Sequence, residues 1–99
     1  MSINSAMLAG VSGLVANSSA MAVISDNISN VNTIAFKRNR ADFSRLVNSQ
    51  SASTTYNAGG ASASTRQLIG AQGSVNSTSL STDLAVQGNG FFVVTPAAQ

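Results

Sequence analysis

Cysteine, histidine and glutamate are all absent from this 99-residue sequence. Without cysteine there is no disulfide framework and no thiolate metal site. Without cysteine or histidine, the usual nucleophile and base of a catalytic triad are also missing. The three carboxylates are far apart in the sequence and follow no paired-acid or metal-ligand spacing: Asp26, Asp42 and Asp83. We therefore predict no catalytic site, no metal site and no cofactor, and we expect a structural or assembly protein.

Charged residues are scarce as well, at 8% of the chain, against roughly 25% in typical soluble domains. A solvated monomer normally carries a charged surface, so this composition predicts that much of the surface is hidden in an assembly. The net charge is only +2. The high isoelectric point reflects few ionisable groups more than a basic surface, and it gives little support for binding to nucleic acid or anionic lipid.

A single long helix is predicted over residues 3–29. Large apolar residues recur every seven positions at Met7, Leu14, Met21 and Ile28. The companion positions of this heptad hold Ile3, Ile24 and Val31, and Val11 widens the stripe. The pattern is typical of a helix that packs against other helices. The other face holds small neutral residues, with no charge before Asp26. Such a helix either is marginal and frays or packs within a polymer, and the regular heptad favours the polymer. Because nothing from residue 50 onward has helical periodicity, we expect the partner helix in another subunit or outside this sequence.

Two membrane-related interpretations of the same helix are less favoured. Residues 6–16 resemble the apolar core of a signal peptide, but no basic residue precedes them. The apolar run is shorter than the ~20 residues that span a bilayer, and Asn17, Ser18 and Ser19 interrupt it. An amphipathic helix that binds a membrane surface is the alternative from another class, but the polar face lacks the lysines typical of such helices. We therefore expect no membrane insertion.

Asparagines gather where the heptad ends. Asparagine tolerates the left-handed conformation and bonds to nearby backbone, so Asn27, Asn30 and Asn32 predict a helix C-cap and the turn after it. Phe36 follows as an apolar anchor. The basic residues close by could contact phosphates, but so small a cluster favours a solvated turn or inter-subunit ion pairs over nucleic-acid binding: Lys37, Arg38, Arg40 and Arg45.

The rest of the chain predicts an α+β protein with three parts. Residues 1–31 form the helix, residues 32–79 an extended linker region, and residues 80–99 the start of a β domain. Low complexity over residues 48–79 is compatible with a flexible linker or with a segment that orders against neighbours. Two apolar runs around Asn89-Gly90 predict a hairpin with strands at 83–87 and 91–95. A final strand with no sheet to join is typical of an N-terminal piece of a longer chain.

Two segments of the sequence resemble bacterial flagellar rod and hook axial proteins. Residues 12–37, "SGLVANSSAMAVISDNISNVNTIAFK", resemble the family signature of a helix that ends in an asparagine-rich turn, then an aromatic residue and lysine. The matching positions are Asn27, Asn30, Asn32, Thr33, Phe36 and Lys37. Residues 82–94, "TDLAVQGNGFFVV", resemble the second family block. Ala35 departs from the signature, which usually has glycine there, and it would strain the turn if that position requires positive φ.

Within this family, the opening residues and "FKRNRADFSRLV" are most similar to hook proteins, with distal rod proteins as the alternative. The resemblance implies a self-polymerising tube that passes torque from motor to filament outside the cell. It implies contacts with rod, hook-cap and hook–filament junction proteins, and a helix that pairs with a C-terminal helix of the same subunit. It also implies type III export without a cleaved signal peptide. Phe43 and Val47 match a short pattern recognised at the export gate, although an ordinary apolar pair explains them equally well.

Overall fold

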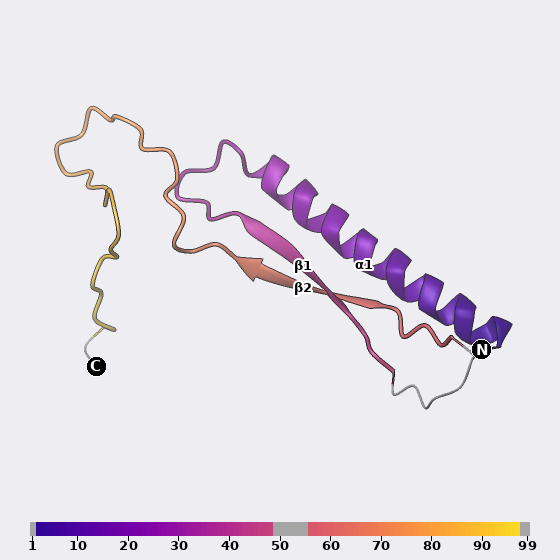
Figure 1. The fold of residues 1–99 in the computed structure, drawn as a ribbon. Helices are drawn as coiled ribbons and strands as arrows, with labels where there is room; N and C mark the ends of the chain where they lie inside the picture. Colours follow the sequence, from indigo (N-terminus) through magenta and orange to yellow (C-terminus); the bar gives the residue numbers. More distant parts are fainter. Residues whose placement is uncertain (1, 49–55, 98–99) are drawn as a thin grey trace.

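The computed structural model describes residues 2–48 and 56–97. Its regular elements are one long helix and one β-hairpin. Helix α1 spans Ile3–Ser29, strand β1 spans Asn39–Arg45 and strand β2 spans Ala61–Gln67 (Figure 1). The predicted helix over residues 3–29 is therefore confirmed. The radius of gyration is 21.6 Å, whereas a compact domain of about 100 residues has roughly 13 Å. The molecule is elongated, and among the described residues only Ala16 and Val23 are buried.

Helix α1 has a side-chain cap at each end. Ser2 is the N-cap, with extended backbone angles, and its hydroxyl accepts a hydrogen bond from the Ser5 N–H at 3.2 Å. Asn30 is the C-cap, and both its backbone N–H, at 3.1 Å, and its side-chain Nδ2, at 2.9 Å, donate to the Asp26 carbonyl. The C-cap predicted from the asparagines is thus confirmed at Asn30. Both ends of the helix are set by short polar side chains rather than by glycine or proline.

Strands β1 and β2 pair antiparallel over seven residues each, from Asn39 opposite Gln67 to Arg45 opposite Ala61. Two more hydrogen bonds extend the ladder at its ends: Leu68 N–H to Arg38 O at 2.9 Å and Leu46 N–H to Gly60 O at 3.0 Å. Part of the connection between the strands, residues 49–55, lies outside the described residues, as does part of the low-complexity segment expected at 48–79. The rest of that segment includes an ordered strand.

The predicted α+β class is confirmed, but the predicted place of the hairpin is wrong. Residues 83–87 and 91–95 form no strands, and the chain bends at Gly88 and Asn89 instead of turning at Asn89-Gly90. The side chain of Gln72 holds this bend, donating to the Val86 carbonyl at 3.4 Å and accepting from the Gly88 N–H at 3.3 Å. An isolated two-stranded hairpin is marginal in water, and this segment runs away from α1 and the β1–β2 hairpin (Figure 1). No strand among the described residues pairs with it.

The β1–β2 hairpin instead lies along one side of α1 (Figure 1). The helix residues on that side are small, and all are buried or half-buried: Ala9, Ser12, Ala16, Ser19, Ala20 and Val23. The hairpin meets them with half-buried alanines, Ala41, Ala61 and Ala63. Small residues on both sides allow the two elements to approach closely. The hairpin therefore gives α1 a partner on its small-residue side that the sequence did not indicate. The seam, for which a partner helix was expected in another subunit or outside this sequence, stays exposed.

Candidate assembly surface and helix–hairpin joint

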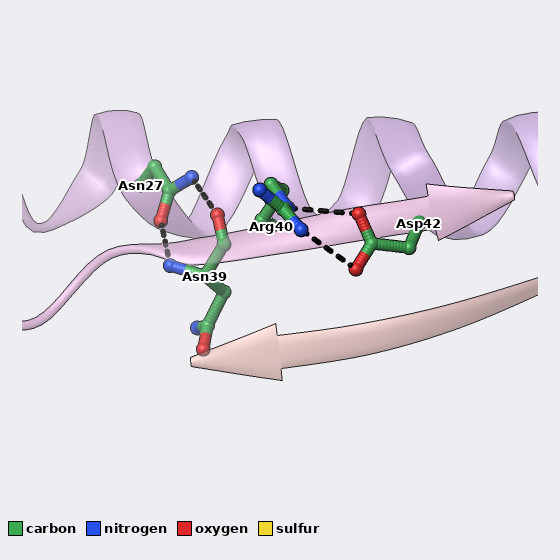
Figure 2. A network of polar contacts seen from close by, with 4 residues as sticks. All are labelled: Asn27, Asn39, Arg40 and Asp42. Carbon is green, nitrogen blue, oxygen red and sulfur yellow. Dashed lines mark hydrogen bonds and ion pairs between the residues drawn. The ribbon is translucent and has the colours of Figure 1, made fainter. Parts of the chain in front are cut away.

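The joint between α1 and β1 depends on the side-chain amide of Asn27. Its Nδ2 donates to the Asn39 carbonyl at 2.8 Å, and its Oδ1 accepts from the Asn39 N–H at 2.9 Å (Figure 2). The Arg38 carbonyl accepts from the Leu68 N–H across the ladder. Because successive residues of an antiparallel strand alternate between facing the partner strand and facing away, the N–H and C=O of Asn39 point away from β2. The amide of Asn27 thus acts as a third strand would, and it satisfies both backbone groups at the edge of β1.

Neighbouring polar groups reinforce this amide joint. Asp26 accepts from Asn39 Nδ2 at 3.1 Å through one carboxylate oxygen and from Asn30 Nδ2 at 3.2 Å through the other. Asn30 Oδ1 in turn accepts from the Thr33 hydroxyl at 3.1 Å. The helix end, the turn and the start of β1 therefore share one hydrogen-bond network. The sequence predicted Asn27 as part of a cap and turn, and its long-range role was missed because nothing indicated that β1 folds back to it.

The turn after the helix contains an alanine in the left-handed region. Ala35 has φ of +65°, which meets the condition under which alanine was expected to strain this turn. The two signature residues that follow Ala35, Phe36 and Lys37, are half-buried. Lys37 Nζ donates to the Ala71 carbonyl at 2.6 Å, and Gln67 Nε2 donates to the Lys37 carbonyl at 3.2 Å. Lys37 therefore ties the turn to the chain after β2.

A second contact fixes the far end of the hairpin on the helix. The Ser12 hydroxyl accepts from the Ala61 N–H at 3.2 Å and donates to the Ala9 carbonyl at 2.6 Å. The adjacent Gly60 has φ of +84°, and a Cβ built on it would collide with the Ser12 Oγ. Glycine is required at this position both for its backbone conformation and for its close approach to α1. This contact and the Asn27 amide fix the hairpin to the helix at two widely separated points.

The heptad seam lies on roughly the opposite side of α1 from the hairpin, because successive residues are rotated by about 100°. Every one of its predicted members is exposed: Ile3, Met7, Val11, Leu14, Met21, Ile24, Ile28 and Val31. The exposed fraction ranges from 51% at Ile24 to 81% at Ile3. A contiguous exposed apolar stripe of this kind marks an interaction surface. Its role in packing and assembly stays a prediction.

The remaining predicted site residues lie away from the joint. Phe43 is in β1, opposite Ala63, and is 54% exposed, while Val47 follows the strand and is 82% exposed. Both side chains are accessible, and export-gate recognition stays a prediction. Asn32 is exposed in the turn, and Asn89 lies in the bend described above.

Helix α1 also bears on the membrane interpretation. Taken over its whole length, it is long and apolar enough to cross a membrane, although its uninterrupted apolar runs are short. Core helices of soluble proteins and N-terminal signal sequences share this property, so length and composition do not separate the possibilities. In this structure the hairpin covers one side of the helix, whereas a helix that spans a membrane would expose that side to lipid.

Comparison with known proteins connects this chain with the flagellum. Residues 7–37 match the family described as flagella basal body rod protein, a range that covers the asparagine-rich turn and Lys37. Over 95 residues the chain is 60% identical to the flagellar hook protein FlgE of Caulobacter vibrioides, covering 96% of this chain and 16% of that protein. It is 43% identical over 94 residues to the hook protein of Brucella abortus, covering 95% and 24%.

A more distant relative shows the same pattern. The hook protein of Helicobacter mustelae is 36% identical over 100 residues, with 88% of this chain and 22% of that protein covered. No solved structure matches the chain significantly. The chain spans about a quarter or less of the length of these hook proteins, with 16% and 24% as the shares in the first two relatives. The resemblance to rod and hook proteins that the sequence predicted is confirmed.

Proposed function

We propose that this chain is the N-terminal part of a structural subunit of the bacterial flagellar hook. The observation that carries the proposal is the 60% identity to a hook protein across 95 residues, which include both the helix and the hairpin. The whole subunit would polymerise into a flexible tube outside the cell and transmit torque from motor to filament. Catalysis has no part in this function.

The exposed seam of α1 supports a role in building that tube. Its large apolar side chains have no partner among the described residues, and full burial of one such side chain stabilises by about 1.5–3 kcal/mol. The hairpin already covers the small-residue face, so the seam is the side left for other helices. In this proposal residues 1–31 belong to the inner tube, residues 32–79 bridge neighbouring subunits, and residues 80–99 begin a further β domain.

Assembly and export partners form a finer level of the same proposal. Rod, hook-cap and hook–filament junction proteins would contact the subunit at the ends of the tube. The subunit would reach its site through the type III export gate without a cleaved signal peptide. Phe43 and Val47 are the candidate recognition pair at the gate, supported by their exposure. Phe43→Ala is expected to lower secretion of the full-length protein more than it lowers assembly of purified protein, and undiminished secretion would remove this role.

Immunogold electron microscopy on flagellated cells tests the proposal directly. Antibody against this chain should label the short curved segment between the cell surface and the filament. A rod subunit is the second candidate, because the matching family is described as a rod protein. Label confined to the rod of detergent-extracted basal bodies would establish that candidate instead. Absence of label from both structures, with the epitope exposed and the protein expressed, would contradict both.

A membrane-binding domain is distinguished by a separate measurement. The length and composition of α1 are compatible with a membrane segment, so the full-length protein should be tested for co-sedimentation with neutral and anionic liposomes. A hook or rod subunit is expected to stay in the supernatant. Sedimentation with liposomes that depends on residues 3–29 would favour the membrane interpretation.

A further inference from the structure

The outward face of the β1–β2 hairpin carries most of the positive charge of the chain. All five basic residues lie in or next to the hairpin strands: Lys37, Arg38, Arg40, Arg45 and Arg66. Alternate residues of a strand share a face. Arg38 and Arg40 therefore lie on the same face as Arg66, which is directly opposite Arg40 in the register. All three are exposed, while the other face presents the half-buried alanines to the helix.

The three arginines, which we term the arginine face (Arg38, Arg40, Arg66), are not balanced within the hairpin. Arg40 forms a two-point ion pair with Asp42, with Nε to Oδ1 at 2.8 Å and Nη2 to Oδ2 at 3.1 Å (Figure 2). This is the only ion pair among the described residues. Like charges directly opposite each other destabilise a strand pair, and Arg66 faces Arg40 in this way. The hairpin thus holds an excess of positive charge that its own fold does not neutralise.

We propose that the arginine face docks a carboxylate-rich segment of a neighbouring polypeptide, lying outside residues 1–99. Arginine is suited to this partner because its planar guanidinium binds carboxylates in a two-point geometry, the geometry that Asp42 already shows with Arg40. The chain offers few acidic groups of its own to a second copy. Asp26 is bonded to Asn30 and Asn39, and Asp42 to Arg40, which leaves only Asp83. The proposal is independent of the proposed function, since any assembly could supply such a segment.

Peptide binding to the full-length protein tests the chemistry. The probe is a fluorescent decaglutamate peptide, followed by anisotropy at low and high salt, with decaglutamine as the neutral control. Arg38→Gln and Arg66→Gln should each weaken binding about two- to fivefold, as expected for exposed charge pairs, and the double variant should weaken it further. Arg45→Gln is the matched control. It removes the same charge from the same hairpin, but Arg45 lies on the other face, opposite Ala61, so the affinity should not change.

Three results would overturn the proposal. Equal weakening by Arg45→Gln would indicate a general charge effect, and absence of binding at low salt would indicate no site. Preference for a DNA oligonucleotide of equal charge over the peptide would assign the face to nucleic acid. Far-UV circular dichroism of each variant checks that the exposed glutamines leave the fold intact.

Carbodiimide cross-linking of the assembled full-length protein tests the source of the segment. The reagent activates a carboxylate, and a lysine amine then forms an amide with it. The carbodiimide takes up the water lost in this condensation and leaves as a urea. Arg66→Lys keeps the charge and supplies the amine, with Arg45→Lys as its control. The expected product joins Lys at position 66 of one subunit to an Asp or Glu of another polypeptide, outside residues 1–99, and 0.5 M salt reduces its yield. Products confined to Asp26, Asp42 or Asp83, or equal yields in both variants, would contradict the proposal.

Discussion

The two faces of α1 have opposite properties. One face consists of small side chains, is covered by the hairpin and includes the buried Ala16 and Val23. The other carries the large apolar side chains of the seam, more than half exposed. In most amphipathic helices the large apolar residues face the core of their own domain. Here the intramolecular contact uses small residues, and the large ones stay exposed in the described part of the chain.

This division explains how one helix can serve two kinds of contact. Small residues allow close backbone approach, and the hairpin is held there by hydrogen bonds at two points, Asn27 to Asn39 and Ser12 to Ala61. Polar bonds fix geometry but contribute modestly to net stability. Burial of large apolar side chains contributes more. The first contact is therefore suited to fixing the angle between helix and hairpin, and the second to driving association.

A charge in the seam should have the largest effect. Leu14→Asp or Ile24→Asp would bury an unpaired carboxylate if the seam packs against other helices, at a cost of several kcal/mol. We expect the full-length variants to be exported but to form no polymer, as measured by electron microscopy of cells and by secretion assays. Leu14→Met conserves volume and should assemble normally. Normal polymers from both aspartate variants would show that the seam is not an assembly surface.

A side chain at position 60 should weaken the contact between α1 and the hairpin. Gly60→Ala places an L-residue at φ of +84° and a methyl group against Ser12. We expect the hairpin–helix contact to lose roughly 2–4 kcal/mol. Amide hydrogen exchange of β1 and β2 in the full-length protein should become faster. Gly73→Ala is the control, because a Cβ there meets no atom within 4 Å. Equal exchange rates in both variants would contradict the close approach at Gly60.

The helix could be predicted from the sequence because its signals are local. Heptad spacing and the polar residues at each end specify α1 from residue 3 to residue 29, and the structure has the same bounds. The seam was found in the same way. The sequence also indicated that Ala35 would be strained if its position required positive φ, because the family signature usually has glycine there.

The hairpin could not be predicted because its stability comes from contacts across the sequence. Strand β2 reads as a low-complexity run, "ASASTRQ", with none of the β-branched and aromatic enrichment of a typical strand except one threonine. Its alanines become meaningful only beside the small face of α1. Residues 91–94 have the opposite character, with strong strand composition but no neighbour to pair with in the described structure. Local preference was therefore overridden in both places by the presence or absence of a packing partner.

Loss of the amide joint should have a smaller effect than the change at Gly60. Asn27→Asp keeps an acceptor for the Asn39 N–H but removes the donor to its carbonyl and places negative charge beside it. The contact between α1 and β1 should lose about 1–3 kcal/mol of stability. Relative to the unsubstituted protein, hydrogen exchange of the Asn39 amide should become faster, and by more than that of amides in the middle of β1. Asn32→Asp makes the same chemical change at an exposed turn position and should leave these rates unchanged. Unchanged exchange at Asn39 in Asn27→Asp would show that the joint does not depend on this side chain.

The smallest expected effect is a gain in stability at Ala35. An L-residue in the left-handed region is disfavoured by about 1–2 kcal/mol, and part of the relief is offset because glycine loses more backbone entropy on folding. Ala35→Gly should therefore stabilise the turn by roughly 0.5–1 kcal/mol, seen as slower exchange at the helix end and at Asn39. Ala35→Val should have the opposite sign, because a β-branched residue tolerates φ of +65° less well than alanine. If glycine and valine shift the exchange rates in the same direction, backbone conformation is not what limits this turn, and the hydrogen-bond network of Asp26, Asn27 and Asn30 controls it instead.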